Sequence, residues 1–221
     1  MARCRDCLCY DQTQGIIEWW LWCLLPVVIV LILLAAAILM LLHFAIIPHV
    51  LVSVTDARLD TFTFTTTQES VTATPLFHYN ISVALWIRNP NNAMSIKHSK
   101  PFLATFAFHN RRLHNLTVLD EGHKHRPGKK ELLPLHATGQ IPSFRLGDAA
   151  AEDFKIQNAT GLFKIELRLS GEITYQGIGV AKKPKLSVSC PLELQLAPPG
   201  SEIIVFPEVN CKPVAEDKVN F

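Results

Sequence analysis

One stretch of the chain is apolar without interruption. Residues 19–47 contain no Asp, Glu, Lys or Arg. As an α-helix this stretch would be about 43 Å long, whereas the hydrocarbon core of a membrane is about 30 Å thick. Three tryptophans near its amino end, Trp19, Trp20 and Trp22, suit the headgroup layer. The pattern predicts a single transmembrane helix that follows a short tail, residues 1–18.

A cleaved signal peptide is the alternative interpretation of this stretch. Residues 24–34 have the length of an apolar signal-peptide core, and the three alanines at 35–37 resemble a cleavage site. A peptidase site needs a polar, extended flank, but the apolar run continues to Ile47. We therefore expect residues 19–47 to be an uncleaved signal anchor, followed by one outer domain over residues 48–221.

Beyond the anchor, apolar and polar residues alternate with a period of two, which is typical of half-buried strands. The clearest case is residues 76–88, which place these residues on one face: Phe77, Tyr79, Ile81, Val83, Leu85 and Ile87. Asn89-Pro90-Asn91-Asn92 then predicts a turn. Shorter alternating runs predict strands over residues 50–55, 61–65, 102–109, 113–119, 131–138, 162–175 and 186–196.

The period changes between residues 141 and 160. Asp148, which follows a glycine, is expected to cap a short helix that continues to about Gln157. Gly171 predicts a bulge or bend in its strand, and Pro134 predicts an edge strand or a bulge. The fold class is therefore mainly β, an antiparallel β-sandwich with one short helix.

Composition excludes several classes of function. The chain has 221 residues, a formal net charge of +2 and a pI of about 8.2. Nucleic-acid binding is therefore not indicated. The sequence lacks the glycine-rich dinucleotide and phosphate loops and the G-x-S-x-G nucleophile motif. We expect a protein that is not an enzyme and needs no cofactor or metal.

The six cysteines fall into separate regions of the chain. Cys190 and Cys211 are the only two in the outer domain, where a disulfide is the simplest expectation and two buried free thiols are the alternative. Cys4, Cys7 and Cys9 lie in the tail, near the predicted membrane. They are candidates for reversible acylation, or remain reduced thiols, since three ligands are too few for a closed metal site.

Three N-glycosylation acceptor patterns occur, at Asn80, Asn115 and Asn158, and all of them follow the anchor. Together with the distribution of cysteines, they predict a cytosolic amino terminus. The outer domain would then lie on the lumenal or extracellular side of the membrane.

Residues 120–130 form a basic segment that is predicted to be an exposed loop. Its cations could meet an anionic wall polysaccharide or lipid headgroups, although a simple solvated loop is favoured: Lys124, Arg126, Lys129 and Lys130. His123 and His125 alternate in the same segment and could share a face. A metal or proton-sensing site is conceivable there, but solvated histidines are the better expectation.

Several motifs occur in an order that carries a family likeness. A cysteine-bearing tail and an anchor precede Asn89-Pro90-Asn91, the run IELRLSG at 165–171 and the run KPKLSVSC at 183–190. The chain resembles the plant harpin-induced-like and non-race-specific disease-resistance-like proteins of late-embryogenesis-abundant group 2. The resemblance implies an immunoglobulin- or fibronectin-III-like sandwich, held at the plasma membrane, with a non-enzymatic role in defence or abiotic stress.

Two functions are compatible with these expectations. In the first, the sandwich is an interaction module whose partners are the bilayer and a protein or cell-wall component. In the second, it is a stress-protective or lipid-binding protein that stabilises the contact between membrane and wall during dehydration. A filled core favours the first function, whereas a continuous apolar groove between the sheets favours the second.

Overall fold

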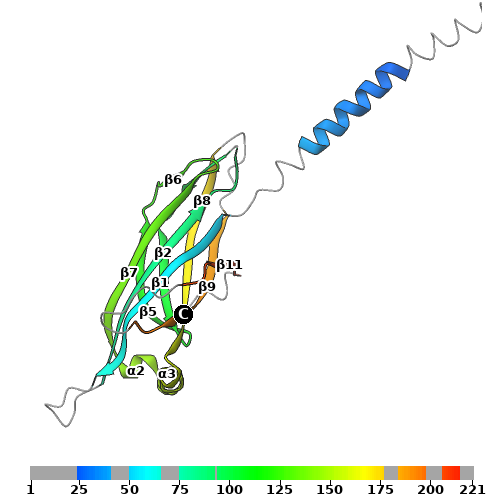
Figure 1. Ribbon diagram of the computed structural model, residues 1–221. Coiled ribbons are helices and arrows are strands. Elements are labelled where there is room, and N and C mark those ends of the chain that lie inside the picture. Colours follow the sequence, from blue (N-terminus) through cyan, green and yellow to red (C-terminus); the bar gives the residue numbers. More distant parts are fainter. Residues whose placement is uncertain are drawn as a thin grey trace, which may run out of the picture. The chain divides into compact units, whose positions relative to one another are not determined.

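The computed structural model describes residues 24–40, 50–65, 75–92, 94–176, 184–197 and 206–214. The chain divides into two units, residues 1–47 and 48–221. In the first unit, residues 24–40 form an α-helix (Figure 1). No helix within the described ranges combines the length and apolar character needed to cross a membrane. The tail with Cys4, Cys7 and Cys9, and both ends of the apolar run, lie outside the described residues.

The second unit is built from two antiparallel sheets, as the alternating pattern predicts. The first sheet has the order β10-β1-β2-β7. Its strands are β1 (Leu51–Thr65), β2 (Leu76–Arg88), β7 (Lys130–Pro142) and the short β10 (Val209–Asn210). Within it, β2 pairs with β7 over its whole length, from Leu76↔Pro142 to Arg88↔Lys130.

The second sheet is centred on β8 (Leu162–Gln176). One side of β8 pairs with β9 (Lys185–Gln195), and the other side pairs first with β4 (Phe102–Phe108) and then with β3 (Ser95–His98). The outer members of this sheet are β5 (Arg111–Leu119), β6 (Lys124–His125) and β11 (Lys212–Pro213).

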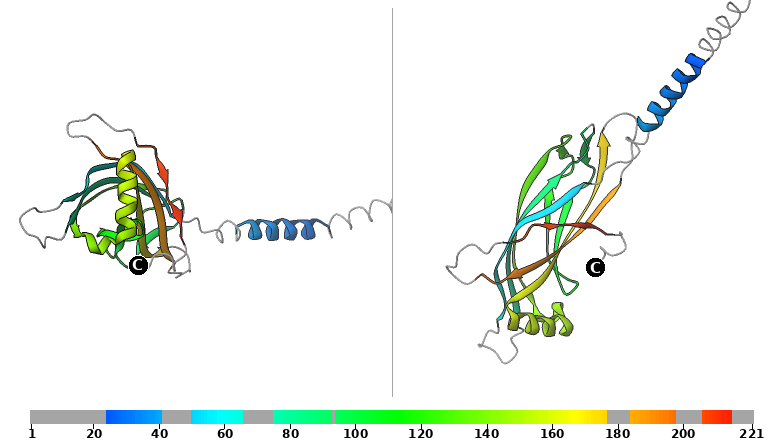
Figure 2. Two further views of the ribbon diagram at one scale, coloured as in Figure 1. Left: turned by 90° about the horizontal axis from the view of Figure 1, so that it is seen from below. Right: turned by 45° about the vertical axis from the view of Figure 1, so that its right-hand side comes forward.

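Two helices connect the sheets at one end of the sandwich. They are α2 (Ser143–Leu146) and α3 (Asp148–Thr160), and α3 crosses that end (Figure 2). The strand β6 lies at the opposite end (Figure 1). The strand β1 also begins at that opposite end. Its first residue, Leu51, pairs with Arg88, and Arg88 pairs with Lys130, the first residue of β7, which follows β6 in the chain.

Aromatic rings from both sheets fill the space between them. The ring of Phe62 lies 4.7 Å from Phe77, 5.2 Å from Phe108 and 4.8 Å from Phe163, measured between centroids. These four side chains are at most 1% exposed. Phe154 of α3 closes the end of the cluster, 5.6 Å from Phe77. The core is therefore filled at this end, which is the condition that favours an interaction module.

The strand predictions are largely confirmed, and β2 buries the predicted face residue by residue. The two runs at 50–55 and 61–65 belong to one strand, β1, which has irregularities in register near Val54 and Leu59. Pro134 lies in β7, at the edge of the described sheet, as predicted.

The structure corrects three local predictions. Gly147, not Asp148, is the N-cap of α3, no side chain caps the helix, and the helix extends to Thr160. Gly171 lies in regular register opposite Leu186, so the bulge, one of the two predicted alternatives, is absent from the pairing with β9. The segment 120–130 is not simply an exposed loop, since it contains β6, in which His125 is only 3% exposed.

Candidate functional site

An open hollow of about 1030 Å³ lies at the helix end of the sandwich. One wall is the turn between β4 and β5, where His109 and Asn110 both have positive φ angles, 44° and 59°. A two-residue turn of this kind needs left-handed backbone at both positions, which asparagine tolerates well. The strand pairing resumes immediately with Phe108 opposite Arg111, so Arg111 and Arg112 lie in β5.

The other wall of the hollow is the junction of α2 and α3. Gly147 joins the two helices with a φ of 84°, a left-handed value that favours glycine. A Cβ at this position would lie 3.7 Å from the Nη2 atom of Arg111. The guanidinium of Arg111 therefore lies against the junction. Arg145 and Asp148 also line the hollow.

The lining of the hollow carries an excess of positive charge. Arg111, Arg112 and Arg145 are exposed, and none forms an ion pair with a described carboxylate. Asp148 is the single acidic residue among the described lining residues. Because a guanidinium presents several donors in one plane, such a group of arginines suits carboxylate, sulfate or phosphate oxygens.

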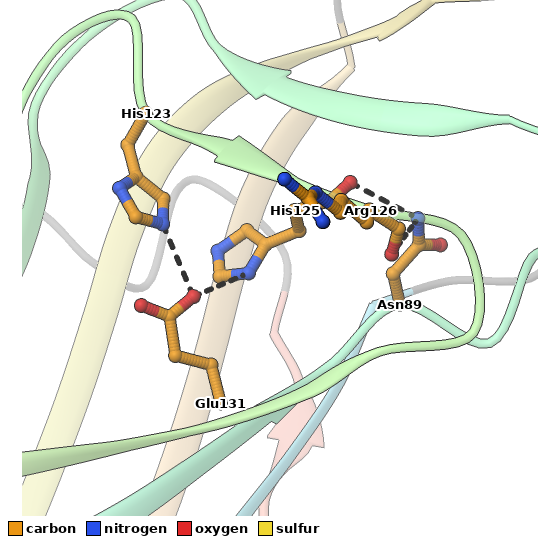
Figure 3. A network of polar contacts seen from close by, with 5 residues as sticks. All are labelled: Asn89, His123, His125, Arg126 and Glu131. Atoms are coloured by element: carbon orange, nitrogen blue, oxygen red, sulfur yellow. Dashed lines mark hydrogen bonds and ion pairs between the residues drawn. The ribbon is translucent and has the colours of Figure 1, made fainter.

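A second polar site lies at the opposite end, where two imidazoles share one carboxylate oxygen (Figure 3). His123 Nε2 lies 3.1 Å from Glu131 Oε2, and His125 Nδ1 lies 3.0 Å from the same atom. The ring of His98 lies beside them, 5.2 Å from His125. We call these four residues the histidine cluster. His98 Nδ1 and His125 Nε2 are buried and have no hydrogen-bond partner among the described residues.

Asn89 fixes the backbone around the histidine cluster. Its buried amide nitrogen donates to the carbonyl of Met94 at 2.9 Å. It also donates to the carbonyls of Arg126 at 3.3 Å and His125 at 3.5 Å (Figure 3). Its side-chain oxygen accepts a hydrogen bond from Asn91 N–H. The Asn-Pro-Asn motif therefore does more than turn the chain, because it also positions β6.

Burial controls the charge of two of these histidines. Burial, which is the largest cause, and the neighbouring His125 and His123 together lower the pKa of His98 to about 4, although Glu131 opposes the shift. Burial also lowers the pKa of His125, against the influence of Glu131. In both imidazoles burial thus favours the neutral form.

The residues singled out in the sequence do not form one site. Cys190 and Cys211 are joined by a disulfide, with Cα atoms 4.4 Å apart. Asn115 and Asn158 are exposed, whereas Asn80 is half-buried and its Oδ1 accepts a hydrogen bond from Thr138. Asn115 also lines the hollow.

The basic segment lies away from the hollow, at the end where β1 begins. Its cations Lys124, Arg126, Lys129 and Lys130 are exposed. The ammonium of Lys130 lies 4.2 Å from the ring centroid of Trp86. The structure thus separates this basic segment from the three arginines of the hollow. The sequence analysis did not identify these arginines as a group. The pair Arg111-Arg112 was visible, but only the fold brings Arg145 to the same hollow.

Comparison with known proteins finds no matching family and no matching curated protein. Similar solved structures include a protein from Archaeoglobus fulgidus, with 11% identity, a TM-score of 0.28, and coverage of 65% of this chain and 98% of that one. A protein from Arabidopsis thaliana has 21% identity and a TM-score of 0.37, covering 68% and 83%. A third, described as a candidate late embryogenesis abundant protein, has 16% identity and a TM-score of 0.35, covering 77% and 85%. At these values the likeness says nothing about the function of this chain.

Proposed function

We propose that this chain is a non-enzymatic, single-pass plasma-membrane protein with a cytosolic amino terminus. Its sandwich, of the immunoglobulin or fibronectin-III type, faces the apoplast and serves as an interaction module in plant defence or abiotic stress. Support for the anchor comes from residues 19–47, which carry no charged side chain. The defence or stress role rests on the family resemblance of the sequence motifs.

The main support for an interaction module is that the core is filled at the helix end of the sandwich, whereas the hollow at the same end is open and polar. The phenylalanine cluster fills the space between the sheets at the helix end, so these residues leave no apolar groove for a lipid at that end. The hollow is instead lined by Arg111, Arg112 and Arg145. We propose that these arginines bind the carboxylates of an acidic cell-wall polysaccharide.

Other features support the proposed side of the membrane. A disulfide between Cys190 and Cys211 and exposed acceptor sites at Asn115 and Asn158 suit an extracytoplasmic domain.

The proposal is tested by binding of the full chain, in detergent or nanodiscs, to de-esterified polygalacturonate. The variant Arg111→Gln/Arg112→Gln/Arg145→Gln is compared with a matched variant at the other end, Lys124→Gln/Arg126→Gln/Lys129→Gln. We expect the first variant to bind at least about tenfold more weakly and the second to bind within about twofold of the wild type. Absence of binding, or equal losses in both variants, would contradict the proposal.

A further inference from the structure

We propose that His123, His125 and Glu131 form a binding site for a divalent transition-metal ion, with Zn²⁺ as the ion that fits best. The proposal concerns the opposite end of the sandwich from the hollow and does not depend on the function proposed above. Each residue offers one ligand atom, and the three atoms all lie within 4.8 Å of one another.

The donor set matches the chemistry of zinc. Two imidazole nitrogens and one carboxylate oxygen are the protein ligands of many zinc sites that keep a fourth position open. Around a tetrahedral ion with bonds of about 2.1 Å, ligand atoms lie about 3.4 Å apart. The two nitrogens lie 3.1 and 3.0 Å from Glu131 Oε2, so a small outward movement of the side chains would admit the ion between them.

A third imidazole lies at the same place. His98 is only 1% exposed, and its Nδ1 has no hydrogen-bond partner among the described residues, although nearly all buried polar atoms in folded proteins have one. The His98 ring lies 5.2 Å from His125 and 6.2 Å from His123. Three imidazole side chains therefore lie around the carboxylate of Glu131. A group of side chains that only filled space would not need so many polar nitrogens.

The backbone holds the ligands in place, while their side chains leave a route of entry. His98 N–H donates to the carbonyl of His123 at 2.9 Å, and Gly122 N–H donates to the carbonyl of His98 at 2.8 Å. Asn89 fixes the carbonyl of His125. By contrast, the side chains of His123 and Glu131 are 33% and 37% exposed, so an ion from solution can reach them.

The site would connect the two sheets. His125 belongs to β6 in the sheet centred on β8, whereas Glu131 belongs to β7 in the sheet that contains β1. A bound ion would therefore act as a cross-link between the sheets at the end where β1 begins. Because such an ion binds the folded state only, its binding stabilises the fold.

The test is calorimetric titration of the purified full chain with ZnCl₂ after treatment with a chelator. The reference protein carries Cys4→Ser, Cys7→Ser and Cys9→Ser, because thiolates in the tail would bind zinc themselves. In this background we compare His123→Ala, Glu131→Gln and the control His136→Ala. His136 is an exposed histidine of the same strand as Glu131, where it bonds to Ser82 and Thr138.

We expect the reference and His136→Ala to bind one Zn²⁺ ion per chain at this site. His123→Ala and Glu131→Gln are expected to bind at least about tenfold more weakly. Addition of Zn²⁺ should raise the midpoint of thermal unfolding of the reference and of His136→Ala only. The proposal is overturned if the reference binds no ion, or if His123→Ala and Glu131→Gln, folded by circular dichroism, bind as the reference does.

Discussion

Gly171 lies beneath the fully buried ring of Phe102. A Cβ at position 171 would lie 2.7 Å from Phe102 Cδ2, closer than packed carbon atoms approach. Either the ring or the strand would have to move, so Gly171→Ala should lower the free energy of unfolding by about 1–3 kcal/mol. Chemical denaturation measures this change. Ser170→Ala, at the neighbouring position, should stay within about 0.5 kcal/mol of the wild type.

The carboxyl group of Glu166, in β8, makes the stability of the protein depend on pH. The hydrogen bond from Arg168, 2.6 Å long, and a second from Ser189 hold the pKa of Glu166 below its ordinary value, although burial opposes this shift. A carboxyl whose folded pKa is lowered stabilises the protein above its unfolded pKa. That contribution is lost as the pH falls through the folded pKa.

Glu166→Gln should therefore be less stable than the wild type at neutral pH, and the difference should shrink as the pH falls below 4.5, the ordinary pKa of this group. Urea denaturation above and below this pH measures the difference in the free energy of unfolding. The control is Glu193→Gln on the adjacent strand, because this carboxylate is 63% exposed and lies 4.0 Å from Lys164. A difference for Glu166→Gln that does not change with pH would show that the ion pair does not control it.

At the scale of elements, the strands were predictable because each one has one face in the core. In β2, six alternating residues are buried, and the same alternation is visible in the sequence. The environment of His125 was not predictable. Its neighbours in sequence are charged, but its burial depends on pairing with Ile96 of β3 and on Glu131 of the other sheet. Such contacts leave no periodic signal.

The same reasoning explains the outcome at Gly171 and in the hollow. A glycine in a strand indicates either a bulge or a close approach, and only the position of Phe102 decides between them. Arg145 lies far along the chain from Arg111 and Arg112, and the short helix α2, which sets its position, has no strong pattern of its own.

The carboxy-terminal segment depends on the disulfide between Cys190 and Cys211. On one side of Cys211, β10 pairs with β1, and on the other side β11 pairs with β9. The segment thus spans both sheets with two very short strands. Cys190→Ala/Cys211→Ala should lower the free energy of unfolding by about 3 kcal/mol, the value for a loop of about 20 residues.

Thermal and chemical denaturation of the full chain measure this change, and Cys4→Ser serves as the control. A reducing agent should destabilise the wild type but leave the double variant unaffected. If the double variant were as stable as the wild type, the cross-link would not hold this segment to the sandwich.

At the scale of the whole molecule, one acceptor asparagine coincides with the proposed binding surface. Asn115 lines the helix-end hollow and is exposed, so a glycan at this position would compete with an acidic polysaccharide. Thr117→Ala removes the acceptor pattern without changing Asn115 itself. For protein made in plant cells, this variant should bind polygalacturonate more tightly than the wild type. Asn158→Gln, which removes an acceptor site outside the described lining, should not change the affinity.

The proposed orientation across the membrane makes the two parts of the chain differ in accessibility. If residues 19–47 anchor the chain with its tail in the cytosol, trypsin added to intact protoplasts should reach exposed basic residues of the outer domain, such as Lys124 and Lys129. Arg3 and Arg5 in the tail should be cleaved only after the membrane is permeabilised. Mass spectrometry of the peptides released under the two conditions measures this difference. Cleavage in the tail of intact protoplasts, with residues 50–221 untouched, would reverse the orientation and remove the cell wall as the place where the arginines meet their partner.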